Sequence, residues 1–181
     1  MSDTSLPHHE FDDCLWIRCA NRGSFINSPT LKSLAEAYLA KGGINIVVDL
    51  EVCPGVDSTF MGTLAALSRK VLAVGGHAMV ASPTQRTRAA MESLGLDMLM
   101  EIDPPAPFWQ DDVEQRRAQL ETVTEGDAEE SEPMSELERT RHVLDAHNTL
   151  RSMNTKNDQT FGYVCETLEE DLQRHSQVDD K

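Results

Sequence analysis

The sequence predicts an α/β domain with a mixed, mostly parallel sheet, followed by a helical and acidic C-terminal extension. Before residue 103, short apolar segments rich in β-branched residues alternate with segments of helical periodicity, and this alternation predicts the domain. Asp and Glu outnumber Lys and Arg by 12 to 8 through Pro105 and by 19 to 8 after it, which predicts a separate acidic region.

The first strand and the first helix are predicted early in the chain. Residues 14–19 alternate loosely between apolar and polar side chains and include Trp and Ile, which favours a strand. Ser28 then provides a helix N-cap, with Pro29 at the first helical position. Apolar residues recur at helical spacing until Gly42 ends the helix.

A central strand and a second helix are predicted next. Residues 44–50 are rich in β-branched side chains and apolar almost throughout, as expected for a strand covered on both faces. From Ser58 the apolar residues follow helical periodicity as far as Gly75. Residues 78–81 then form a short strand.

The last helix and strand complete the sheet. Ser82 and Pro83 open a helix that runs to about Leu94, Gly95 terminates it, and residues 96–102 are predicted as the final strand. Helices placed regularly between short strands are typical of parallel strands joined by right-handed crossovers.

Four segments follow from this pattern. Residues 1–10 are an N-terminal tail and residues 11–102 are the α/β domain. The proline-rich run after residue 102 cannot continue a strand ladder, so residues 103–134 are taken as a proline-rich, acidic and partly disordered linker. A helix over residues 113–123 stays open within it. Residues 135–181 form the helical extension.

The extension is predicted to contain two helices. Ser135 and Glu138 have the spacing of a capping box. A second helix over about residues 158–174 has one apolar stripe, made of Phe161, Val164, Leu168 and Leu172. Two helices alone bury little surface, so the stripe should pack against the domain or against a second copy, as in a homodimer.

Charge and composition exclude several classes of partner. The net charge of −15 argues against nucleic acid and anionic membranes, because both attract basic surfaces. No segment approaches the roughly 20 apolar residues that insertion into a membrane requires. The N-terminus lacks the features of a secretory signal, so a cytoplasmic location is expected.

The residues with catalytic or metal-binding potential form no convincing pattern. His142 and His147 lie five positions apart, a spacing that splays side chains on a helix, so no metal site is predicted. Cys53 and His77 could pair as nucleophile and base only if the fold brought them together. Glycine-rich phosphate-binding motifs are absent. The sequence therefore predicts a non-enzymatic protein without a cofactor.

One continuous segment carries a specific signature. Residues 47–62 read VVDLEVCPGVDSTFMG, a buried strand ending in Asp-Leu, a loop, and then Asp-Ser-Thr at the start of a helix. This segment resembles the signature of the STAS family, which includes bacterial anti-sigma-factor antagonists. The positions that match in kind and spacing are Asp49, Asp57, Ser58, Thr59, Met61 and Gly62. Phe60 departs from the pattern, because many antagonists have Gly there.

The resemblance implies a phosphorylation switch. Ser58 would be the phosphoacceptor for an anti-sigma factor that is also a serine kinase of the histidine-kinase ATPase type, and a serine phosphatase would reset it. Asp57, Thr59 and Gly62 would support that site, and Asp49 would belong to the motif strand. The unphosphorylated form would bind the kinase, so the protein would take part in partner switching that regulates transcription.

Other functions stay open. Asp57, Ser58 and Thr59 are all favoured at helix starts, so they could serve only as a cap. The chain could then be a phosphorylation-independent scaffold whose acidic C-terminal helices hold a partner. A STAS subunit of a lipid-trafficking transporter is the third alternative.

Overall fold

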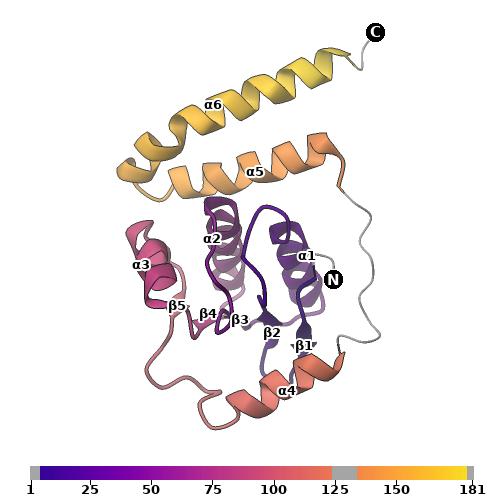
Figure 1. Ribbon diagram of the computed structural model, residues 1–181, viewed down its shortest axis with the longest axis vertical. Coiled ribbons are helices and arrows are strands. Elements are labelled where there is room, and N and C mark those ends of the chain that lie inside the picture. The colour runs from indigo at the N-terminus through magenta and orange to yellow at the C-terminus, as the bar shows by residue number, and fades with distance from the viewer. Residues whose placement is uncertain (1–4, 124–133, 179–181) are drawn as a thin grey trace.

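Five strands form one sheet in the order β1-β2-β3-β4-β5. The computed structural model describes residues 5–123 and 134–178 (Figure 1). The strands are β1 (His8–Glu10), β2 (Leu15–Arg18), β3 (Ile46–Asp49), β4 (Ala78–Ala81) and β5 (Glu101–Ile102). β1 runs antiparallel to β2, and the other neighbours are parallel. The predicted mixed, mostly parallel sheet is confirmed.

Helices follow the strands, as the sequence predicts. They are α1 (Ser28–Ala40), α2 (Ser58–Ala73), α3 (Gln85–Ser93), α4 (Val113–Val123), α5 (Glu136–Arg151) and α6 (Thr155–Val178), with a short 3-10 helix η1 (Leu96–Met98). Among the described residues, no helix combines the length and apolar character needed to cross a membrane.

Alternating side chains divide the sheet between two hydrophobic cores. Ile46 and Val48 of β3 pack on the larger core with α1, α2 and α3, whereas Val47 faces the smaller core. In that smaller core Trp109 and Leu120 cover the other face of the sheet. Because both faces are covered, every residue of β3 is buried.

Two parts of the sheet differ from the prediction. Residues 8–10, assigned to the tail, pair with β2 as an antiparallel edge strand. The strand predicted over residues 96–102 is wrong in its first half, because Gly95 has a φ of 84° and turns the chain into η1. Only Glu101 and Ile102 join the sheet. In this 3-10 helix the backbone hydrogen bonds form within the segment itself, so residues 96–98 do not pair with a neighbouring strand.

Two buried arginines hold α4 against the sheet. The guanidinium of Arg117 donates to both carboxylate oxygens of Asp49 at 2.8 and 3.0 Å, and also to Glu51. Arg116 pairs with Asp13 through two bonds of 2.8 Å. The helix left open over residues 113–123 therefore forms and is held by charge pairs, although its sequence has little apolar character.

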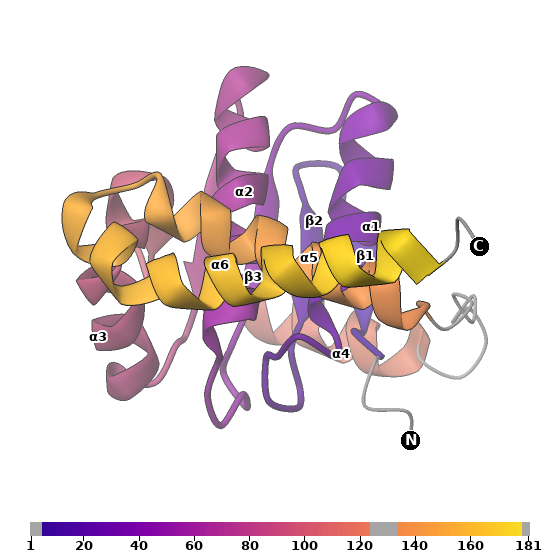
Figure 2. The same cartoon turned by 90° about the horizontal axis from the view of Figure 1, so that it is seen from above.

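The C-terminal helices form a hairpin that lies across the end of α2 (Figures 1 and 2). Ser135 and Glu138 form the predicted capping box at the start of α5. The predicted stripe of α6 is partly wrong, because Val164 is 38% exposed while Cys165 is fully buried. Cys165 lies four positions after Phe161 and three before Leu168, which are both partly buried, so it belongs to the buried side of α6.

Candidate functional site

The predicted site lies where α2 begins, at the carboxyl end of the sheet. Ser58 is the first residue of α2, and Asp57 is its N-cap. One carboxylate oxygen of Asp57 accepts from the Phe60 amide at 2.8 Å, and the other accepts from the Phe25 amide at 3.0 Å. Asp57 therefore both caps the helix and holds the loop that precedes α1.

Backbone hydrogen bonds also hold the loop that leads to Ser58. The amide of Gly23 donates to the Gly55 carbonyl at 3.0 Å, and the amide of Asp57 donates to the Gly23 carbonyl at 2.8 Å. A side chain on Gly23 would meet the ring of Phe60 at 2.9 Å. Phe60 is fully buried in the larger core, so the departure from the signature at this position leaves the surface around Ser58 clear of that ring.

The Ser58 hydroxyl bonds to a histidine of the C-terminal extension. Its Oγ lies 2.9 Å from Nε2 of His147. The other ring nitrogen, Nδ1, lies 2.8 Å from the Val143 carbonyl, which can only accept, so Nδ1 carries the hydrogen. In the neutral ring Nε2 is then the acceptor and Ser58 donates to it.

A second serine–histidine pair lies beside the first. Ser28 Oγ is 2.8 Å from Nε2 of His142, and Thr63 Oγ1 is 3.4 Å from the same atom. Thr63 donates to the Thr59 carbonyl at 2.9 Å. Burial lowers the pKa of His142, with Lys32 contributing in the same direction, so a neutral imidazole is favoured in the folded chain.

Between the two serine–histidine pairs, α2 and α5 cross so closely that the backbone of α5 contacts Gly62 of α2. A Cβ on Gly62 would lie 2.2 Å from the Ala146 carbonyl oxygen. No side chain fits in that space, so the glycine of the signature is what allows α5 to cross α2 here. Thr59 is 4% exposed and points away from solvent.

Asp49 lies apart from the other predicted site residues. It is fully buried at the end of β3 and faces α4, where it bonds to Arg117. Ser58, Asp57, Thr59 and Gly62 are brought together at α2, whereas Asp49 anchors the opposite layer. Sequence reasoning noticed His142 and His147 only as a weak metal pair and did not place them against serines.

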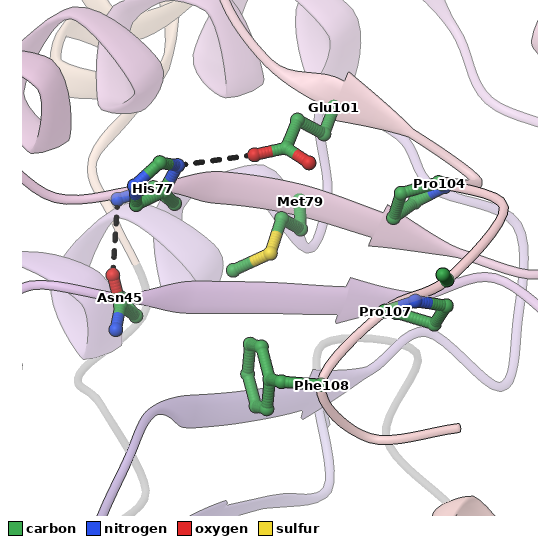
Figure 3. Close-up of a pocket in the computed structure, with 8 residues that line it drawn as sticks. Asn45, His77, Met79, Glu101, Pro104, Pro107 and Phe108 are labelled. Atoms are coloured by element: carbon green, nitrogen blue, oxygen red, sulfur yellow. Dashed lines mark hydrogen bonds and ion pairs between the residues drawn. The ribbon is translucent and has the colours of Figure 1, made fainter.

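Cys53 and His77, considered as a nucleophile and its base, do not lie together in the structure. His77 precedes β4, whereas Cys53 follows the parallel neighbour β3, so the two residues lie at opposite ends of the sheet. His77 bonds to Glu101 at 3.0 Å (Figure 3). Beside it lies a pocket of about 230 Å³, lined by Asn45, His77, Met79, Glu101, Pro104, Ala106, Pro107 and Phe108. Among the described residues, no group of three or more His, Cys, Asp or Glu could hold a metal ion.

The loop before Ser58 also contains a perturbed thiol. A hydrogen bond with Cys19 is the main cause that lowers the pKa of Cys53 to about 6, against the opposing effect of burial. Both thiols are buried, and each donates to a backbone carbonyl, Cys53 to Gly55 at 3.2 Å and Cys19 to Asn21 at 3.1 Å. These hydrogen bonds contribute to holding the loops after β2 and after β3 in place.

Comparison with known proteins decides the family. Residues 6–108 match the family model of the STAS domain, which is more than half of the chain. The chain belongs to the STAS-domain family. This match contains α2 and the whole sheet, and it leaves α4, α5 and α6 outside. A search of curated proteins found no significant match.

Solved structures show the same fold. A protein of Thermotoga maritima assigned as an anti-sigma factor antagonist is 18% identical with a TM-score of 0.51, covering 64% of this chain and 94% of its own. An anti-sigma factor antagonist from Mycobacterium paratuberculosis is 18% identical with a TM-score of 0.50, covering 65% and 93% respectively. At this identity the similarity establishes the STAS fold.

Proposed function

We propose that this STAS protein is an anti-sigma-factor antagonist whose binding to a serine kinase is controlled by phosphorylation of Ser58. The observation that carries the proposal is the position of Ser58 at the first residue of α2, directly after the capping carboxylate of Asp57. The two structural relatives assigned as anti-sigma factor antagonists support the same class of function. The partner would be an anti-sigma factor of the histidine-kinase ATPase type.

The chemistry of this position suits a switch. A phosphate on Ser58 adds a charge of about −1.5 to −2. The helix dipole and free backbone donors at the start of a helix tolerate that charge, whereas a partner surface packed against Ser58 does not. The burial of Thr59 supports Ser58 as the acceptor and a structural role for the Thr59 hydroxyl.

The proposal is tested on the protein purified from its native host and on the kinases of that host. Peptide mapping by mass spectrometry should find a phosphate on Ser58, and the Ser58→Ala variant should accept none from the partner kinase. Ser93→Ala is the matched control, since Ser93 is exposed at the end of α3. An unmodified Ser58 under all growth conditions, and in every kinase reaction, would refute the proposal.

A second candidate is a scaffold that needs no phosphorylation. It is favoured by the bond between Ser58 and His147, which already gives the hydroxyl a structural partner. In that case Ser58→Ala would keep every partner of the native chain in a co-purification, and no phosphate would be found.

A further inference from the structure

We propose that the face of α2 around Ser58 is an interaction surface shared by α5 and the partner kinase, so that α5 must leave before the partner can dock. This inference rests on the proposed function of Ser58. The surface, here called the α2 face, consists of Ser58, Gly62 and Thr63 of α2 together with Ser28 at the adjoining start of α1.

The α2 face has the shape and the hydrogen-bonding groups to bind a helix. Because Gly62 has no side chain, the Ala146 backbone occupies the space that a Cβ at position 62 would need. On either side of this crossing a hydroxyl bonds to a histidine of α5, Ser58 to His147 and Ser28 to His142. The contact thus combines close backbone packing with two serine–histidine hydrogen bonds, and it leaves the predicted phosphoacceptor partly buried.

Beyond the α2 face, the hairpin contacts the domain both in its core and at its surface. Leu150 of α5 is fully buried in the larger core, and Phe161 of α6 is partly buried against the same core. The side-chain amide of Asn157 donates to the Leu94 carbonyl at 2.9 Å. Arg69 of α2 donates to the Ser152 hydroxyl at 2.9 Å on the surface. Detachment would expose Leu150 and the buried Asn157 amide to water, so the docked hairpin is the favoured state and the open state is a minor population.

The docked hairpin excludes a kinase that packs on the α2 face. Transfer would form a bond between Ser58 Oγ and the γ-phosphorus of ATP, break the bond to the bridging oxygen of ADP, and release the hydroxyl proton to a base of the kinase. With Oγ 2.9 Å from Nε2 of His147, α5 occupies the side of Ser58 on which the kinase would pack. The docked state and the kinase-bound state therefore exclude each other, and the open fraction scales the apparent affinity for the kinase.

The test measures access to position 58 without any kinase. A Ser58→Cys variant of the full chain is treated with N-ethylmaleimide, and peptide mapping follows alkylation at that position alone. Gly62→Ala is added to force α5 away, because its Cβ would overlap the Ala146 carbonyl. Gly162→Ala in α6 is the matched control, since a Cβ there meets nothing within 4 Å. Unfolded samples give the intrinsic rate for each variant.

Alkylation should be at least tenfold faster with Gly62→Ala than with either the single Ser58→Cys variant or the Gly162→Ala control. Equal rates would overturn the inference. If Gly62→Ala fails to fold, as judged by circular dichroism and melting, Ala146→Glu perturbs the same crossing from the side of α5 and leaves α2 unchanged. The same acceleration is then expected.

A kinase reaction on chains that retain Ser58 separates this inference from the proposed function. Faster phosphorylation of Gly62→Ala than of the native chain supports both. Phosphorylation at equal rates supports the function of Ser58 and overturns the competition with α5. Faster alkylation, with no kinase able to phosphorylate either chain, supports the cover by α5 and rejects the phosphorylation switch.

Discussion

Replacing Arg117 by leucine tests whether the signature residue Asp49 is held by α4. Asp49 is fully buried, and the Arg117 side chain is 8% exposed, so Arg117→Leu leaves a buried carboxylate without its guanidinium. Removing one member of a buried ion pair costs about 3–5 kcal/mol. At about 2–4 °C per kcal/mol for a chain of this length, the melting temperature should fall by about 6–20 °C.

The assays are urea denaturation, which gives the free energy of unfolding, and thermal melting, both followed by tryptophan fluorescence. Trp16 and Trp109 are suitable reporters, because they stack edge to face at 5.4 Å in the core beneath α4. Arg88→Leu is the matched control: Arg88 pairs with Glu92 at the surface, 42% exposed, and should cost less than about 1 kcal/mol. Adding Asp49→Leu to Arg117→Leu should recover most of the loss, since an apolar pair can replace an ionic one. Equal stability of the two single variants would refute the reasoning.

Two further predictions concern the site itself. Asp57→Ala should lower the free energy of unfolding by about 0.5–2 kcal/mol and speed hydrogen exchange at the Phe25 amide. Thr84→Ala removes the cap of α3 at a similar cost and should leave that amide protected; loss of protection in both variants would contradict the role of Asp57. Because burial lowers the pKa of His142, the unfolded chain binds its proton at higher pH than the folded chain does. The free energy of unfolding should therefore fall as pH drops below about 6.5, by at most about 1.4 kcal/mol per pH unit. Urea denaturation of His142→Gln should show a flatter slope, and an unchanged slope would contradict this cause.

The STAS core was predictable because its signals are local. The buried strand over residues 46–49, the cap at Asp57 and the start of α2 at Ser58 each follow from a few neighbouring residues. The boundary errors have local causes as well. Gly95 turned an apolar segment into a 3-10 helix, and the edge strand β1 has too few residues to show a period.

The cover over Ser58 could not be predicted in the same way. Ser58 and His147 are 89 positions apart, and helical periodicity indicates that a face is buried without saying against what. The charge pairs of α4 were hidden for a related reason. Arg117 looks like a solvated residue of an acidic segment until Asp49 is placed opposite it, 68 positions away. One sign was available: a glycine within the second turn of a helix indicates a close backbone approach.

Because α5 belongs to the same chain as the surface it covers, it competes as a tethered ligand. A short covalent tether gives the attached module an effective concentration of about a millimolar. A separate helix of equal intrinsic affinity, present at about a micromolar, would therefore occupy the α2 face about a thousandfold less often than α5. A partner that succeeds must contact more of the domain than the hairpin does. The partner concentration needed for half-maximal binding at Ser58 would then depend on how tightly α5 holds the α2 face.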